Sequence, residues 1–261
     1  MFTTFAAVTP ITVTDYWNLA YWITERFSLE GNSAAITALV CGLLCIAIPY
    51  LIGSINPAIL ISTLIYQDDI RTHGSGNAGT TNMLRTFGGK AAIATLLLDF
   101  GKAAIATLLG RLLFGIWGQA IAGLFVGFGH MFPAYYKLRG GKGVACFGIV
   151  ALVINPVAFL IILFTFVVVL IGTRFVSLSS VMAAIIYPMA FHWGAVITNT
   201  ELTNGPNLLM AFIAACLVTF MHRENLKRIF NNQESKIDFS KFKKKKSKNE
   251  SGNEPPTGDE Q

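Results

Sequence analysis

Residues 143–172 read GVACFGIVALVINPVAFLIILFTFVVVLIG and contain no charged side chain. This run is longer than the ~20 apolar residues that one helix needs to cross a bilayer. Asn155-Pro156 divides it, and a residue that precedes proline disfavours the helical conformation. We therefore expect a tight turn between two spans, 143–155 and 156–172, although a kink within one long helix is the alternative.

Further apolar stretches flank this pair on both sides. Together they give seven predicted spans: 34–65, 91–114, 117–136, 143–155, 156–172, 180–198 and 207–225. A single kinked helix over 143–172 would reduce the count to six. The connections between the spans are short. The pattern predicts an all-α, polytopic integral membrane protein with about seven transmembrane helices.

The composition excludes an ordinary soluble enzyme. Charged residues make up 13% of the 261 residues, against about a quarter of a soluble domain. Thirteen of the 34 lie in the last 31 positions, so the first 230 residues carry only 21 charges. The four cysteines lie in apolar runs, and we expect neither a disulfide framework nor a cluster with histidine. The sequence predicts no metal, no cofactor and no nucleic-acid partner.

The distribution of Lys and Arg predicts the orientation in the membrane. With the N-terminus outside and seven spans, the inner segments and the C-terminal tail carry 17 of the 20 basic residues. The opposite orientation, or six spans, would leave many of these residues on the outer side. We therefore expect an outer N-terminus, a cytoplasmic C-terminus and seven spans.

Two extensions flank the predicted membrane domain, 33–230. Residues 1–32 include an aromatic, mixed-polar stretch at 16–27, which favours either an interfacial segment or a disordered leader. Residues 231–261 contain a lysine run at 243–246 followed by Glu, Pro and Gly, and predict a basic, disordered cytoplasmic tail. Its lysines either contact anionic lipid or are simply solvated.

The first of three polar segments on the predicted inner side is HGSGNAGTTN at 73–82, followed by Arg85. Its glycines permit positive φ and exposed amides, so the loop can form an anion-binding nest. A short helix after the turn would carry Asn82 and Arg85 on one face. The candidates are Ser75, Gly76, Asn77, Gly79, Asn82 and Arg85. A plain Gly-rich connector is the alternative.

The second segment joins GHMFP at 129–133 to GGKG at 140–143. Glycine amides and a lysine before an apolar helix suit a phosphate or an acyl phosphate. The segment lacks a Walker A pattern, and basic residues at the membrane edge are the alternative. The candidates are His130, Gly140, Gly141, Lys142 and Gly143, although a lone histidine near a helix end is often structural.

The third segment is HRENLKR at 222–228. His222 and Asn225 are spaced to share one helix face toward the bundle, while Arg223 and Lys227 would face lipid headgroups. An interfacial anchor is the alternative. Within the second span, Asp99 and Lys102 are also three apart, and we expect them to form a structural pair.

These segments would place cations, amides and hydroxyls beside apolar helices at the cytoplasmic side. Such a cavity suits a substrate with a phosphate head and an apolar tail. A transporter or lipid carrier would also use polar groups between helices. The gathering of these groups at one membrane face, rather than at the midplane, favours an enzyme.

In this order, the three segments resemble the acyl-phosphate-dependent glycerol-3-phosphate acyltransferases of bacterial membranes, the PlsY family. The matching motifs are GSGNAGTTN at 74–82 with Arg85, GHMFP to GGKG, and HREN at 222–225. The resemblance covers about residues 40–230. Thr80 and Cys146 depart from the usual pattern, as do Leu138-Arg139 and Gly101.

The resemblance implies transfer of an acyl chain from acyl phosphate to the 1-hydroxyl of glycerol 3-phosphate, giving lysophosphatidic acid and phosphate. It implies a bacterial inner-membrane enzyme of phospholipid synthesis, with membrane lipids around it, an active site facing the cytoplasm and an acyl-phosphate synthase as a candidate partner. The functional residues that carry over are Ser75, Arg85, Lys142, His222 and Asn225, and we add Asn77 for alignment. The departing phosphate is the proposed proton acceptor, and His222 as general base is the alternative.

Overall fold

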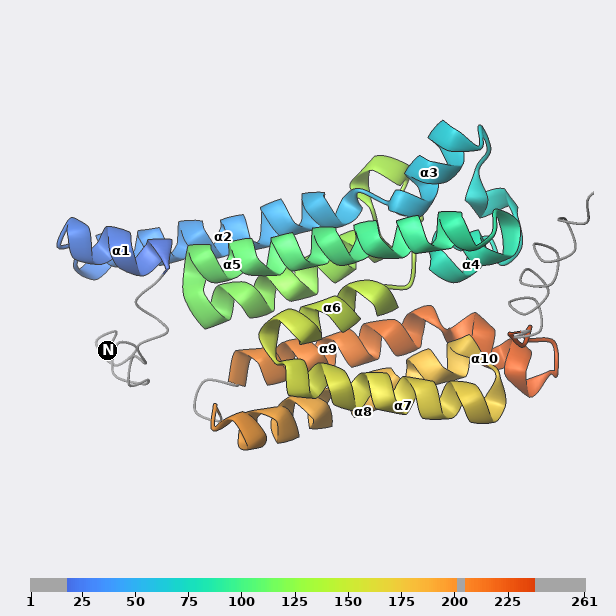
Figure 1. The fold of residues 1–261 in the computed structure, drawn as a ribbon. Helices are drawn as coiled ribbons and strands as arrows, with labels where there is room; N and C mark the ends of the chain where they lie inside the picture. Colours follow the sequence, from blue (N-terminus) through green and yellow to red (C-terminus); the bar gives the residue numbers. More distant parts are fainter. Residues whose placement is uncertain (1–17, 201–204, 238–261) are drawn as a thin grey trace, which may run out of the picture.

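The computed structural model describes residues 18–200 and 205–237, and this part of the chain is helical without strands (Figure 1). The α-helices are α1 (Leu19–Arg26), α2 (Gly31–Ser54), α3 (Pro57–Ile65), α4 (Thr80–Thr86), α5 (Gly89–Met131), α6 (Val144–Ile154), α7 (Pro156–Thr173), α8 (Val176–Thr198), α9 (Gly205–Met221) and α10 (Arg223–Phe230). Within the described residues, η3 (Ile70–Thr72) and η4 (Ala134–Tyr136) are 3₁₀ turns in the loops. The predicted all-α class is confirmed.

Helix α5 folds back on itself and so supplies two antiparallel arms (Figure 1). The reversal occurs at Phe114 and Gly115, where Gly115 has φ 60°. The arms pack closely behind the turn, because a Cβ on Gly118 would lie 2.0 Å from the carbonyl oxygen of Gly110. This turn falls between the predicted spans 91–114 and 117–136.

The predicted break at Asn155-Pro156 is confirmed. Asn155 ends α6 in an extended conformation, and its Oδ1 accepts a hydrogen bond from the Ala158 amide at the start of α7. Pro156 occupies the first turn of α7, where proline is well tolerated. Helix α6 has 11 residues and is about 16 Å long, roughly half of a bilayer core.

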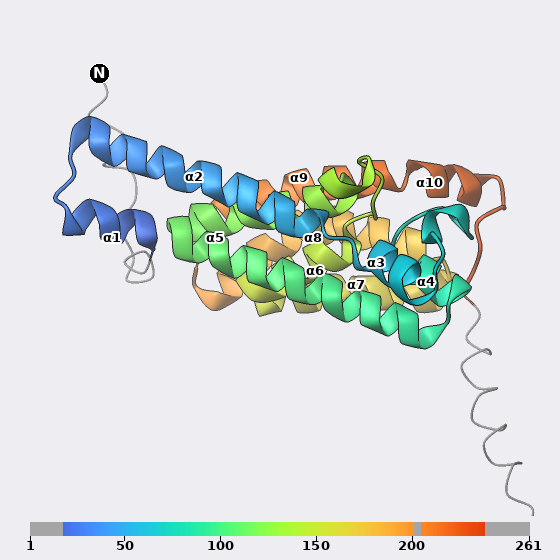
Figure 2. The same cartoon turned by 90° about the horizontal axis from the view of Figure 1, so that it is seen from above.

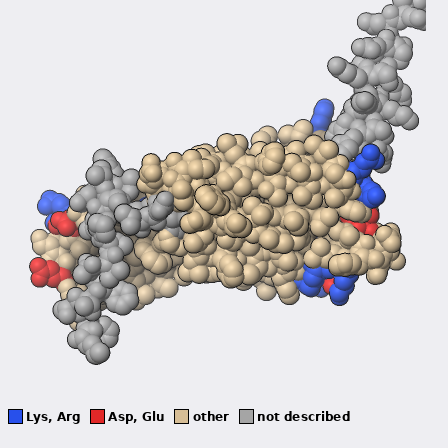
Figure 3. All heavy atoms as spheres, turned by 90° about the horizontal axis from the view of Figure 1, so that it is seen from below, with Lys and Arg blue, Asp and Glu red and all other residues tan. Residues whose placement is uncertain are grey.

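The helices present an apolar band to their surroundings. Side chains such as Leu64 (74% exposed) and Phe164 (71% exposed) point outward. Charged side chains lie at the two ends of the face drawn in Figure 3, with an uncharged band between them. A large exposed apolar surface of this kind is expected in lipid. The chain is therefore an integral membrane protein.

Four helical segments in the described residues are long and apolar enough to span a membrane: 31–65, 89–136, 156–173 and 176–198. Helices α9 and α10 make a fifth if the pair, bent by 52°, counts as one span. The segment 89–136 counts once here, although its two α5 arms run antiparallel. The seven-span count and the orientation of the termini stay predictions.

The helices pack so that the polar loops meet at one end. Helix α2 lies along α5, α6 packs between α5 and α7, and α8 lies between α7 and α9. Helices α3, α4 and α10 lie at the same end of the molecule (Figures 1 and 2). The N-terminal helix α1 packs against α2 and α5 at the opposite end.

Candidate active site

A cavity of about 440 Å³ lies where α4, the start of α6 and the start of α10 converge. Its polar end is lined by ten of the thirteen predicted site residues: Ser75, Asn77, Gly79, Asn82, Arg85, His130, Lys142, Gly143, His222 and Asn225. Its walls are apolar and aromatic, including Phe100, Phe147, Phe159, Phe166 and Tyr187. Gly76, Gly140 and Gly141 are outside this lining.

The first polar loop is held in shape by Asn82. Its Oδ1 accepts from the Ser75 amide at 3.0 Å, and its Nδ2 donates to the carbonyls of Ile70 (3.1 Å) and His73 (2.9 Å). Gly74 has φ 56° and a Cβ there would lie 2.3 Å from Asn82 Oδ1. We infer that Asn82 shapes the loop that presents Ser75. Its role as a substrate-binding residue stays a prediction.

Helix α4 carries Arg85, as the predicted short helix requires. The same helix begins with Thr80, whose Oγ1 is buried without a hydrogen-bond partner within the described residues. Thr80 also lines the cavity. A buried hydroxyl of this kind is available to a polar ligand group, because burial without a partner is unfavourable. Sequence reasoning noted Thr80 only as a departure from the family pattern.

The glycine loop at 140–143 does not present all of the amides that the sequence predicted for phosphate binding. The amides of Gly140 and Gly141 donate to the carbonyls of Met131 (3.2 Å) and His130 (3.0 Å), so neither faces the cavity. Small size is what these positions require, because a Cβ on Gly141 would lie 2.0 Å from His130 Nε2. Gly143 does line the cavity, with φ 77° at the N-terminus of α6. A helix N-terminus attracts anions. The start of α6 can therefore bind the predicted phosphate, whereas the amides of Gly140 and Gly141 are already hydrogen-bonded.

Lys142 is one of the cations that line the polar end of the cavity. Its Nζ donates to Asn225 Oδ1 across the junction between the glycine loop and α10. Burial is the main cause that lowers the pKa of Lys142 to about 8; the Glu234 carboxylate opposes this shift, and Arg228 and Arg85 add to it. Lys142 is therefore charged at neutral pH and partly neutral in mildly alkaline solution.

The third segment places both predicted residues at the cavity, but not on one helix face. The helix ends at Met221 and restarts at Arg223, so His222 lies at a bend of 52°. The Nδ1–H of His222 is positioned to donate to the Val218 carbonyl at 2.7 Å, which leaves Nε2 for other contacts. The predicted continuous helix was wrong. Lys227 is exposed, as predicted, and pairs with Glu224.

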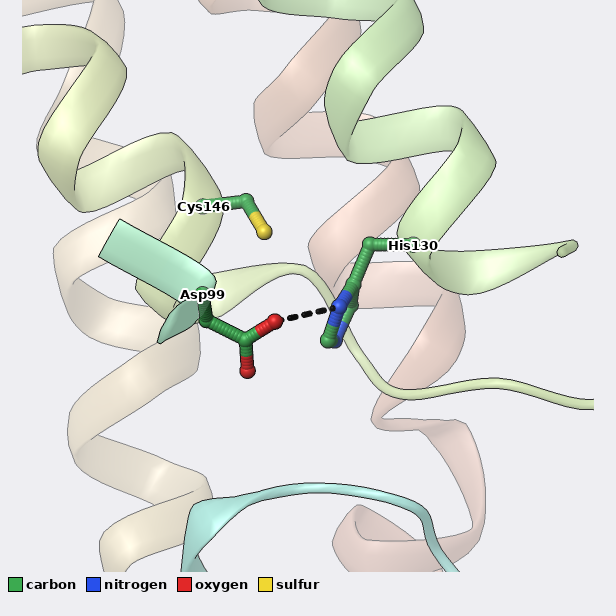
Figure 4. A group of neighbouring side chains, drawn as sticks. All are labelled: Asp99, His130 and Cys146. Carbon is green, nitrogen blue, oxygen red and sulfur yellow. Dashed lines mark ion pairs between the residues drawn. The ribbon is translucent and has the colours of Figure 1, made fainter. Parts of the chain in front are cut away.

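A buried ionic cluster adjoins the cavity (Figure 4). Asp99 Oδ1 lies 2.9 Å from Lys102 Nζ and 3.1 Å from His130 Nδ1, so the predicted Asp99–Lys102 pair is confirmed. Lys102 also donates to the carbonyls of Gly53 (3.1 Å) and Ile55 (2.7 Å), which ties α5 to the α2–α3 junction.

Cys146 lies beside this cluster, contrary to the expectation that no cysteine would gather with a histidine (Figure 4). The candidate ligand atoms of Asp99, His130 and Cys146 lie within 4.8 Å of one another. The positive charge that faces Asp99 and His130 is already supplied by the Lys102 ammonium. The sequence hides the cluster because its members are far apart in the chain.

Sequence reasoning also missed Glu234 and Ser177, which line the cavity. Glu234 falls in the predicted tail, yet its side chain is only 7% exposed. No local signal marks it, because it follows α10 among polar residues. The remaining tail from 238 and the leader before 18 lie outside the described residues.

Fold and cavity together define a class: a helical integral membrane protein with a cationic pocket at one end and apolar pocket walls. Comparison with known proteins makes the assignment specific. Residues 43–232 match the family model described as glycerol-3-phosphate acyltransferase, and the chain belongs to that family.

Relatives and solved structures agree with the family. The chain is 37% identical over 199 residues to the glycerol-3-phosphate acyltransferase of Finegoldia magna (76% of this chain, 96% of the relative). It is 39% identical over 191 residues to the glycerol-3-phosphate acyltransferase of Thermoanaerobacter pseudethanolicus (73% of this chain, 92% of the relative).

One solved structure that aligns with the chain is the crystal structure of PlsY, an integral membrane glycerol 3-phosphate acyltransferase, in its glycerol 3-phosphate form. The TM-score is 0.69 and the sequence identity 32%, and the alignment covers 77% of this chain and 98% of the PlsY chain. The lysophosphatidic acid form aligns with a TM-score of 0.65 and 31% identity, over 76% of this chain and 95% of the PlsY chain. The resemblance to the PlsY family is confirmed.

Proposed function

We propose that this protein transfers an acyl group from acyl phosphate to the 1-hydroxyl of glycerol 3-phosphate. The observation that carries the proposal is one cavity in which Arg85, Lys142 and His222 share a polar end with long apolar walls. Glycerol 3-phosphate and lysophosphatidic acid name the two forms of the solved PlsY structures, and they are the acceptor and the product of the proposed reaction.

The acceptor site is assigned to the cationic end. Arg85 and Lys142 would bind the phosphate of glycerol 3-phosphate, with the amide of Asn225 holding the Lys142 ammonium in place. Charge-assisted hydrogen bonds to phosphate are roughly twice as strong as neutral ones. Ser75 and Asn77 would align the reacting groups from the opposite loop.

The donor is assigned to the apolar walls and the N-terminus of α6. The acyl chain would lie along aromatic and aliphatic side chains such as Phe147, Phe159 and Phe166. The phosphate of the acyl phosphate would lie near Gly143, whose helix end favours negative charge.

The reaction needs no acyl-enzyme intermediate, because acyl phosphate is already activated. The 1-hydroxyl oxygen attacks the acyl carbonyl carbon, the bond from that carbon to the phosphate oxygen breaks, and inorganic phosphate leaves. The hydroxyl proton passes to the departing phosphate, with His222 as general base the competing route. Holding both substrates in line can contribute about 7 kcal/mol or more to catalysis.

Location follows from the charge distribution. We propose that the protein lies in a bacterial inner membrane with the cavity facing the cytoplasm, since 17 of the 20 basic residues fall on that side in the seven-span arrangement. An enzyme that makes acyl phosphate would be the natural supplier of the donor.

Purified protein in detergent tests the proposal with palmitoyl phosphate and glycerol 3-phosphate. We expect phosphate release that depends on glycerol 3-phosphate and equals the lysophosphatidic acid formed. Equal release without the acceptor would indicate a hydrolase. Movement of either substrate across proteoliposomes without product would favour the transporter alternative.

A further inference from the structure

The chain that follows α10 turns back onto the helices instead of leaving them. The amides of Gln233 and Glu234 donate to the Arg228 carbonyl at 2.7 and 3.2 Å. Further on, the Ile237 amide donates to the Arg174 carbonyl at 2.9 Å, between α7 and α8. These bonds fix the segment 231–237, which extends past residue 232, where the family match ends. They place one carboxylate, that of Glu234, inside the cavity lining.

Glu234 is bound by side chains from two helices. Its Oε1 accepts from Ser177 Oγ at 2.8 Å and from Asn225 Nδ2 at 2.7 Å, and its Oε2 accepts from Arg228 Nε at 2.8 Å. Burial raises the pKa of Glu234, but the bonds from Asn225, Arg228 and Ser177 outweigh it, and the pKa is lowered overall. Glu234 is therefore an ionised carboxylate at the edge of the polar end.

The bond from Asn225 to Glu234 has a consequence for Lys142. A side-chain amide has one donor group and one acceptor atom, which point in different directions. Because Nδ2 of Asn225 is held by Glu234, its Oδ1 faces Lys142 Nζ and accepts from it. With the amide reversed, Nδ2 would face the ammonium, and two donors would meet without an acceptor. Glu234 thus determines which atom of Asn225 the lysine meets.

We propose that Glu234 is a positioning residue that orients Asn225 and keeps Lys142 charged and aimed at the anionic substrate. The chemical nature of that anion, the phosphate of glycerol 3-phosphate, rests on the proposed function. The orientation of Asn225 and the charge of Lys142 do not depend on it.

The charges around Lys142 give this role a measurable sign. Burial, Arg228 and Arg85 lower the pKa of Lys142, whereas Glu234 raises it. His222 also interacts electrostatically with the Lys142 ammonium. Removal of the Glu234 charge should therefore lower the pKa of Lys142, whereas removal of the Arg228 charge should raise it. If the two substitutions acted only by loosening the segment 231–237, they would shift the pKa of Lys142 in the same direction.

Three variants in the full-length protein separate these cases: Glu234→Gln, Arg228→Gln and the control Glu224→Gln. Glu224 is an exposed carboxylate on α10 that pairs with Lys227. Reductive methylation of Lys142 against pH, followed by mass spectrometry, reports its neutral fraction, because only the neutral amine reacts. We expect Glu234→Gln to lower the midpoint by about one pH unit, Arg228→Gln to raise it and Glu224→Gln to leave it unchanged.

Activity supplies the second readout. Glu234→Gln should raise KM for glycerol 3-phosphate about tenfold with a smaller change in kcat, because a charge-assisted contact to the substrate is weakened. Glu234→Asp keeps the charge and should restore the Lys142 midpoint. Thermal unfolding in detergent shows whether each variant is folded. If Glu234→Gln does not fold, Arg228→Gln still tests the direction in which the Lys142 midpoint shifts.

The proposal is overturned if Glu234→Gln matches Glu224→Gln in the Lys142 midpoint, or if Arg228→Gln moves that midpoint downward. Wild-type protein that makes no lysophosphatidic acid would defeat the proposed function instead. The methylation experiment would still decide the role of Glu234, so the two failures are distinguishable.

Discussion

Replacement of Lys142 should change the pH dependence of the reaction in a defined way. The pKa of Lys142 is lowered to about 8, chiefly by burial, so in the free enzyme the ammonium loses its proton as the pH rises through about 8. Glycerol 3-phosphate stays a dianion over this range, because its second pKa is about 6. We predict that kcat/KM for glycerol 3-phosphate falls on an alkaline limb with a midpoint near the same pH.

The size of the fall follows from the contact that is lost. A hydrogen bond to a charged group contributes about 1.5–3 kcal/mol, equivalent to roughly 10- to 100-fold in kcat/KM. Bound phosphate favours the ammonium, so the pKa of Lys142 rises in the complex and kcat should decline only at higher pH.

Two substitutions and a control make the assignment specific. Lys142→Arg keeps a positive charge at every accessible pH and should remove the alkaline limb, whereas Lys142→Met should lose roughly 10- to 100-fold in kcat/KM at pH 7. Lys137→Met, in an exposed part of the same loop, should behave like wild type. A Lys142→Arg enzyme that retains the limb would refute the assignment.

Three further substitutions test other parts of the site. His222→Gln should keep near-normal turnover at saturating substrate if the departing phosphate takes the proton, and a loss of about 100-fold or more in kcat would support the general base instead. Gly141→Ala should raise KM for glycerol 3-phosphate about tenfold, because its Cβ would lie 2.0 Å from His130 Nε2, whereas Gly172→Ala, with open space around it, should not. Asp99→Asn should destabilise the protein by about 3–5 kcal/mol in reversible unfolding, since it removes a buried charge that faces an ammonium; an unchanged unfolding free energy would contradict that role.

Local sequence signals predicted two of the breaks between helices, because the residues that end a helix can lie next to the break itself. Asn155-Pro156 specified the α6–α7 turn, and the gap between two apolar runs coincided with the reversal at Phe114 and Gly115. The bend at His222 was missed because no proline or glycine marks it. The resulting segments brought most predicted site residues to one cavity.

The remaining features depend on contacts between distant parts of the chain. Gly140 and Gly141 were expected to bind an anion, but the three-dimensional packing of His130 against them assigns their amides to the α5 carbonyls. Glu234 lay in a polar stretch that resembled a solvated tail, and its burial depends on Ser177 and Asn225. Periodicity and spacing report which residues share a face, whereas these contacts arise only from the fold.

A structure of the protein with glycerol 3-phosphate bound tests the central claim most directly. We predict that the phosphate of the ligand lies within hydrogen-bonding distance of Lys142 and Arg85 and that the 1-hydroxyl of the ligand is directed toward the apolar walls of the cavity. Phosphate bound elsewhere, with Lys142 still paired only to Asn225, would contradict it.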